Sequence, residues 1–188
     1  MIKNMNDTKT NAILTVADLM AAAALTAPKA SGNDTIRTAI ITGEEKDHLR
    51  DKMLAMGEAT GQLLYTRDAG NVDLSEAVVL IGCSGKLFGM DGCGMCGFGN
   101  CKRLKDAGGR CVFTVTDLGI AVGSAVSVAA DHRIDNRVMY SVGRAALKLG
   151  FMTDDTELCY GIPLSISSKS IFFDRGPGAV IDLDTLDD

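Results

Sequence analysis

Cysteine is the residue type in this sequence that is best placed to do chemistry, and four of the six cysteines lie close together. Cys93, Cys96, Cys101 and Cys111 follow the spacing Cys-x2-Cys-x4-Cys-x9-Cys. A Cys-x2-Cys pair can hold one metal centre from a single turn of backbone, and two further thiolates complete the coordination of zinc or of an iron–sulfur cluster. Thiolates are soft ligands that suit both. The pattern therefore predicts a metal centre with these four cysteines as ligands.

The residues between the cysteines favour a cluster over zinc. Four of them are glycines, namely Gly92, Gly94, Gly97 and Gly99. Glycine adopts positive φ at no steric cost, and a loop wrapped round a bulky cluster needs such turns to aim backbone N–H groups at anionic sulfur. A zinc knuckle usually pairs two Cys-x2-Cys hooks, whereas this stretch has one. The residues favour a 4Fe-4S cluster, and leave zinc and free or disulfide-paired cysteines as alternatives.

Basic residues surround the last two cysteines of the motif. They are Lys102, Arg103, Lys105 and Arg110. Two interpretations are equally open: the charges offset the negative charge of a cluster, or they form an ordinary solvated helix face.

The bulk composition limits the function classes. The chain has 188 residues, 46% of them hydrophobic, which predicts one globular domain over residues 1–188 with a cysteine-rich insertion at about 83–111. A net charge of −5 argues against nucleic acid and against an electrostatic membrane anchor. We expect no membrane span and a cytoplasmic location, where thiols stay reduced.

Apolar periodicity gives a coarse secondary structure in which strands and helices alternate irregularly. A frayed start over residues 1–10 and a polar linker over 66–76 are expected. Helices are predicted at 13–24, 44–57, 100–107, from Asp117 as N-cap to 131, and 138–149. Strands are predicted at 38–42, 77–82, 112–116, 158–164, 170–173 and 179–183. This mixed order indicates a layered fold of helices on a sheet.

The stretch "DGCGMCGFGNC" resembles the four-cysteine motif of membrane-associated electron-transfer subunits and corrinoid iron–sulfur proteins. There a Cys-Gly-x-Cys-Gly-x-x-x-Cys core is followed by a fourth cysteine. Cys93, Cys96 and Cys101 match the first three ligands. Cys111 follows after a shorter gap than those families use, so Cys83 is the alternative fourth ligand.

The flanking regions resemble flavin-dependent nitroreductases. In "AAALTAPKASGNDTIRTAIITGEEKDHL", residues Ala27, Pro28, Ala30 and Asn33 occupy the places of that family's Ala-Pro-Ser-Ala-x-Asn segment. "DLGIAVGSAVSVAADH" is similar to its long central helix and "GIPLSISSKSIFFDR" to its closing strand and tail. As a whole, the chain is identified as a member of an uncharacterised family of bacterial and archaeal ferredoxin-domain proteins.

The resemblance implies an α+β fold: a nitroreductase-like α/β sandwich with a central, mainly antiparallel sheet flanked by helices and an inserted Cys/Gly-rich cluster loop. It also implies a homodimer with FMN at the subunit interface. Nitroreductases usually hold the FMN phosphate with arginines before the first helix, whereas this chain has no arginine before Arg37. The proposed flavin contacts are Lys29, Ser31, Asn33 and Arg175.

Two functions from different classes follow. The first is an iron–sulfur redox protein that transfers electrons to FMN or to an electron-transfer partner protein, with FMN-dependent oxidoreductase activity as its enzymatic form. The second is a zinc-binding structural or protein-interaction domain that has lost its flavin. No catalytic residue is assigned by the sequence.

Overall fold

The computed structural model describes residues 2–173, so the strand expected at 179–183 and the proposed flavin contact Arg175 lie outside the described residues. The helices, with their bounds, are α1 (Met5–Thr26), the 3-10 turn η1 (Ala30–Gly32), α2 (Gly43–Thr60), α3 (Leu63–Leu74), α4 (Cys101–Asp106), α5 (Val112–Asp131) and α6 (Tyr140–Leu149). The strands are β1 (Ile36–Ile41), β2 (Ala77–Ser84), β3 (Asp135–Asn136) and β4 (Thr156–Ser165).

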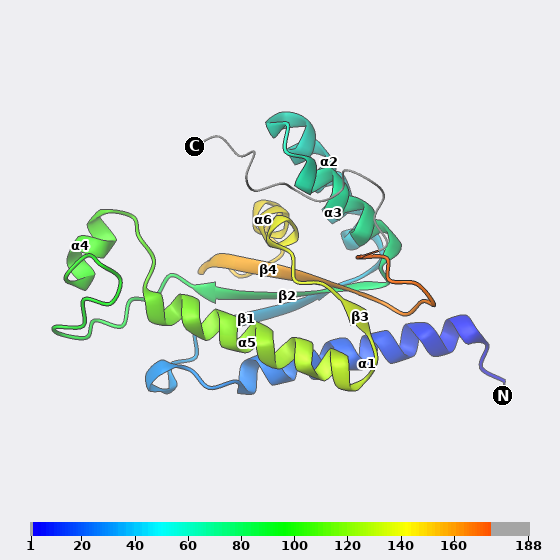
Figure 1. Cartoon of the computed structure of the whole chain (residues 1–188), viewed down its shortest axis with the longest axis horizontal. Coiled ribbons are helices and arrows are strands. Elements are labelled where there is room, and N and C mark those ends of the chain that lie inside the picture. The colour runs from blue at the N-terminus through cyan, green and yellow to red at the C-terminus, as the bar shows by residue number, and fades with distance from the viewer. Residues whose placement is uncertain (1, 174–188) are drawn as a thin grey trace.

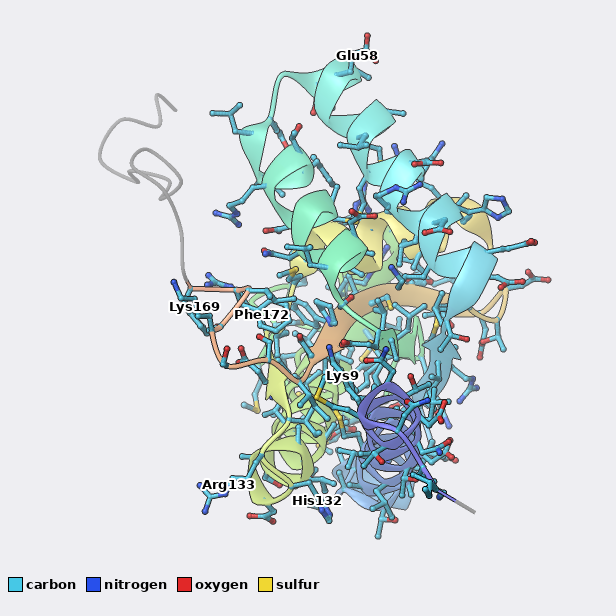
Figure 2. The ribbon with its side chains drawn as sticks, turned by 90° about the vertical axis from the view of Figure 1, so that its right-hand side faces the viewer. Lys9, Glu58, His132, Arg133, Lys169 and Phe172 are labelled. Carbon is cyan, nitrogen blue, oxygen red and sulfur yellow. The ribbon has the colours of Figure 1, made fainter. Side chains whose placement is uncertain are left out.

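The four strands form one sheet between two layers of helices. Their order is β1-β2-β4-β3, and every neighbouring pair is antiparallel. Helices α1 and α5 cover one face, and α2, α3 and α6 cover the other (Figures 1 and 2). A separate buried apolar cluster fills the space on each side of the sheet. This arrangement confirms the expected α+β fold with an antiparallel sheet flanked by helices.

Strand β2 is the centre of the sheet and is buried along its whole length, as its unbroken apolar sequence predicts. Because side chains alternate between the faces of a strand, Val79, Ile81 and Cys83 pack towards α1 and α5. Val78 and Leu80 pack towards α6. The end of β2 at Ser84 therefore has a fixed position, and the cysteine motif begins nine residues later.

Helix α5 packs its small residues against α1 and the sheet. Ala121, Ala125 and Ala129 are fully buried in the cluster on that face. By length and composition α5 would also pass as a membrane span, which is weak evidence because core helices meet the same test. It is the only helix among the described residues that does so.

The linker expected at 66–76 is wrong, because Leu63–Leu74 forms helix α3. The inward face of this helix carries the polar residues Asp68 and Asn71, which conceal its apolar period. Their partners lie elsewhere in the fold: Asp68 accepts from the hydroxyl of Ser141 at 2.5 Å, and Asn71 donates to the carbonyl of Ile171 at 2.6 Å. Tertiary hydrogen bonds therefore replace the apolar contacts that the sequence pattern would show.

Three further boundaries differ from the expectation. The N-terminal segment is helical from Met5, since the side chain of Asn4 caps α1 by accepting from the N–H of Asp7 at 2.9 Å. Residues 112–116 are not a strand but the first residues of α5, whose N-cap is Cys111. Residues 170–173 form a turn, with Phe172 buried in the core.

Candidate metal centre

The cysteine motif lies in a lobe at one end of the molecule. We call residues 85–111 the cysteine lobe; it leaves the end of β2, contains only the short helix α4, and returns to the start of α5 (Figure 1). Contacts with the first turn of α5 help to fix it to the body. The hydroxyl of Thr114 donates to the carbonyl of Lys86 at 2.8 Å, and the rings of Phe88 and Phe113 lie 5.6 Å apart.

The backbone of the lobe turns at its glycines. Gly92, Gly94, Gly97 and Gly99 all have φ between +59° and +82°. An L side chain at these positions would strain the backbone, so the glycines permit the sequence of reversals that brings the cysteines together. Helix α4 then begins at Cys101, because the side chain of Asn100 accepts from the N–H of Arg103 at 3.0 Å.

All four predicted metal ligands line one pocket. Its other walls are mainly apolar, and the lining consists of Phe88, Met90, Cys93, Gly94, Cys96, Asn100, Cys101, Leu104, Cys111, Val112 and Phe113. Within residues 2–173, no three His, Cys, Asp or Glu side chains form a group already spaced to hold a metal ion. The four thiols thus share a pocket without being at the spacing of ligands to a single ion.

Cys111 differs from the other three because it is both buried and bound by backbone donors. It is 7% exposed and occupies the N-cap position of α5. Burial acts to raise the pKa of its thiol, but hydrogen bonding from the N–H groups of Phe88, Thr114 and Phe113 outweighs burial. The net pKa is lowered, as expected for a thiol at a helix N-terminus. The fold therefore makes this thiol easier to deprotonate to the thiolate, the form that binds a metal.

Cys83 and Cys159 lie in the sheet and do not line this pocket. Burial, followed by the nearby charge of Glu157, raises the pKa of Cys83 to about 11. Burial, followed by the proximity of Cys83, raises the pKa of Cys159 to about 12. Both thiols are held in the neutral form. As a fourth ligand, Cys83 is a poorer candidate than Cys111.

The loop proposed to contact FMN lies beside the cysteine lobe. The side chain of Lys86, at the start of the lobe, donates to the Oδ1 of Asn33 at 2.7 Å. Ser31 is exposed and has a φ of 53°. The ammonium of Lys29 donates to the carbonyl of Ala27 at 2.8 Å, and also to the carbonyls of Ala24 and Leu25 at the end of α1. Lys29 therefore caps a helix in this structure.

Sequence reasoning missed two residues that hold these segments together. Asp117 is not a helix cap: it is buried inside α5, and both of its oxygens accept from the N–H of Ala30, at 3.0 and 3.1 Å. Lys86 joins Asn33, in the loop proposed to contact FMN, to the cysteine lobe. The role of Asp117 could have been inferred from sequence, because it is a carboxylate in an otherwise apolar helical stripe. No local pattern distinguishes Lys86 from a solvated lysine.

Sequence comparison places the chain in a family. Residues 107–175 match the family described as "Uncharacterized protein containing a ferredoxin domain (DUF2148)". An uncharacterized protein of Archaeoglobus fulgidus is 42% identical over 185 residues, covering 94% of this chain and 99% of that protein. The chain belongs to this ferredoxin-domain family. The matched segment begins just before Cys111 and includes α5, α6 and β4.

Solved structures with the same fold are nitroreductases. The FMN and NADPH-dependent nitroreductase NfnB from sphigopyxis sp. strain HMH superposes with a TM-score of 0.56 at 13% identity, covering 95% of this chain and 88% of that chain. The FMN-dependent nitroreductase NfnB from Mycobacterium smegmatis, in complex with NADPH, gives a TM-score of 0.55 at 11% identity, covering 82% and 78%. At such identities the likeness shows the fold alone. The nitroreductase-like fold predicted from sequence is confirmed.

Proposed function

We propose that the protein is an iron–sulfur redox protein in which Cys93, Cys96, Cys101 and Cys111 hold a 4Fe-4S cluster. The observation that carries the proposal is the convergence of these four cysteines on one pocket, while the two remaining cysteines are buried in the sheet. The family description, which names a ferredoxin domain, supports the same chemistry. A bound cluster would supply one-electron transfer.

The residues around the pocket would protect and tune such a centre. Phe88, Leu104 and Phe113 give it apolar walls that limit the access of water. The N–H groups at the start of α5 stabilise negative charge on the sulfur of Cys111. The thiols from Cys93 to Cys101 come from a turn-rich segment that can close round the centre, whereas Cys111 is fixed by its helix.

A second cofactor, FMN, is proposed at the loop that contains Lys29, Ser31 and Asn33. The FMN-dependent nitroreductases of the same fold support it. The residues fit the phosphate only in part, because the ammonium of Lys29 already donates to carbonyls of α1. In a flavin titration, Lys29→Ala is expected to weaken binding by at least about tenfold. Unchanged affinity would assign the phosphate to another cation, such as Lys86.

We further propose a homodimer as the working unit, with α5 at the interface. Ala121, Ala125 and Ala129 are core residues of one subunit, so this interface would use the other side of the helix. The outward side of α5 carries Ile120 and Gly123, and a Cβ added at Gly123 would meet no atom. A monomer by light scattering at micromolar concentration would overturn this proposal.

The redox proposal is tested by reducing protein that has been purified without exposure to oxygen. The oxidised protein is expected to be brown, and dithionite should bleach its visible absorption and produce a low-temperature electron paramagnetic resonance signal. A colourless protein, whose spectrum dithionite does not change, would favour the zinc-binding alternative.

A further inference from the structure

Charge is distributed unevenly between the cysteine lobe and the rest of the chain. The lobe contains five basic residues and two acidic ones, so its net charge is +3. The remainder contains 14 basic and 22 acidic residues, which gives −8. A protein with an overall charge of −5 therefore presents a positive region at the end that carries its proposed redox centre. The basic residues are Lys86, Lys102, Arg103, Lys105 and Arg110.

Three of these five cations have no ion pair with any residue among positions 2–173, and one of the three, Lys86, donates to the amide oxygen of Asn33. Lys102 pairs with Asp106 at 2.6 Å and Arg110 with Glu157 at 2.9 Å. Arg103 and Lys105 are exposed on α4 and make no such pair within the described residues. Their charge is available to a partner.

A hollow lined by two basic side chains and one acidic side chain lies on the same lobe. It has a volume of about 420 Å³ and is lined by Gly85, Leu87, Lys105, Gly108, Gly109, Arg110 and Glu157. Leu104 separates it from the cysteine pocket, since that side chain lines the pocket and packs against Gly109. An acidic side chain entering the hollow would meet Lys105, and beside it Arg110 with its ion-pair partner Glu157, close to the proposed redox centre.

Exposed apolar side chains complete the surface. Met90, Met95 and Phe98 are 49%, 66% and 40% exposed, and they flank the cysteines of the motif. Protein interfaces combine such adaptable and aromatic anchors with a charged rim, and methionine is common where the partner surface must be accommodated. A solvated helix face, the plain interpretation of the basic residues, explains neither these three side chains nor the hollow.

We propose that the cysteine lobe is the docking surface for a small acidic one-electron carrier of the ferredoxin class. The inference rests on the proposed redox function. The carrier's own centre loses one electron and the lobe's centre gains one, with no bond made and no proton transferred. The acidic body repels such a carrier while the lobe attracts it, so the carrier approaches with its charged face towards the cysteine pocket.

A matched pair of charge-reversal variants tests the docking. In the lobe variant, Arg103→Glu and Lys105→Glu are combined. The control combines Arg133→Glu and Lys169→Glu, which change the same two residue types at the opposite end of the molecule, the end shown in Figure 2. Both variants carry the same net charge, so a difference between them reports position and not overall charge.

The probe is a purified acidic ferredoxin, and its affinity is measured by calorimetry under anaerobic conditions. The lobe variant is expected to bind at least about tenfold more weakly than wild type at about 20 mM salt, and the control variant within about threefold of wild type. Wild-type affinity should fall when salt is raised to about 200 mM. The neutral variant Arg103→Gln with Lys105→Gln should give an intermediate loss, and it replaces the charge reversal if that variant does not fold.

Iron and sulfide are assayed in the same samples, so that two failures can be told apart. Equal affinity of the lobe and control variants, in protein with its cluster, overturns the docking and leaves the redox function intact. Position-dependent binding by protein that lacks iron supports the docking and contradicts the redox function. Tighter binding of a small basic cytochrome or of a single-stranded oligonucleotide than of the ferredoxin overturns the proposal.

Discussion

Cys83 in the sheet and Cys111 at the edge of the cysteine lobe are both buried, at 1% and 7% exposure. The fold nevertheless shifts the pKa values of the two thiols in opposite directions. The pKa of Cys83 is raised to about 11, whereas that of Cys111 is lowered. Burial favours the neutral thiol at both positions. The difference arises because backbone N–H groups at the start of α5 reach the sulfur of Cys111, and a paired strand offers Cys83 no such donors.

The comparison teaches that a thiol's neighbours in the backbone, more than its exposure, decide whether it is suited to bind a metal. Strand β2 uses its N–H groups in the sheet, with Cys83 paired to Ile36 on one side and Leu158 on the other. A helix N-terminus has N–H groups to spare. The same residue type is therefore a core side chain in one region and a proposed ligand in the other.

The largest expected effect is on metal binding. Cys111→Ser should lose most of the iron of anaerobically purified protein, because it removes the proposed ligand whose thiol pKa the fold lowers. Cys83→Ala should keep it, since that side chain lies outside the cysteine pocket. Iron content and visible absorbance per chain are measured for both variants. Loss of iron in Cys83→Ala with retention in Cys111→Ser would identify Cys83, in the sheet, as the fourth ligand.

A second effect concerns stability at alkaline pH. The folded state holds the Cys83 proton more tightly than the unfolded state, with a pKa of about 11 against an ordinary 9.0. The stability that the protonated Cys83 thiol contributes is therefore fully present below pH 9 and is lost as the pH rises towards 11. Two pH units correspond to about 3 kcal/mol in the free energy of unfolding.

Denaturant unfolding between pH 8 and about 11 measures this loss. The free energy of unfolding should fall more steeply in wild type than in Cys83→Ala, which lacks the titrating thiol. Parallel curves for the two proteins would show that the Cys83 thiol is not held neutral by the fold.

A smaller effect is expected at Thr114, which serves both the lobe and Cys111. Its hydroxyl donates to the carbonyl of Lys86 at 2.8 Å, and its backbone N–H contributes to lowering the pKa of Cys111. Thr114→Val keeps the side-chain shape and removes the hydrogen bond, so we expect a loss of about 1 kcal/mol in stability with iron content retained. Thermal unfolding and iron analysis check the two halves of this expectation. Loss of iron would make Thr114 part of the metal site.

The sequence predicted the fold where apolar period and secondary structure agree, as in α1, β2 and α6. It failed where tertiary contacts override the local pattern. In α3 the buried face includes two polar residues, Asp68 and Asn71, which find partners far along the chain. In residues 112–116 a β-branched run is helical because it forms the first turn after Cys111.

The four cysteines were predictable as a group because their spacing and their glycines are local features. The links that hold residues 29–33 to the lobe and to α5 were not. The bonds from Ala30 to Asp117 and from Lys86 to Asn33 join residues 87 and 53 positions apart. Only the packing of η1 against α5 brings the first pair together.

The most direct test of the account is a metal analysis of protein kept under anaerobic conditions from cell lysis onwards. Iron, acid-labile sulfide and zinc are measured per chain. We predict about four iron and four sulfide per chain and little zinc, as a 4Fe-4S cluster requires. Stoichiometric zinc without iron or sulfide would contradict the redox assignment and leave a zinc-stabilised domain on a nitroreductase-like fold.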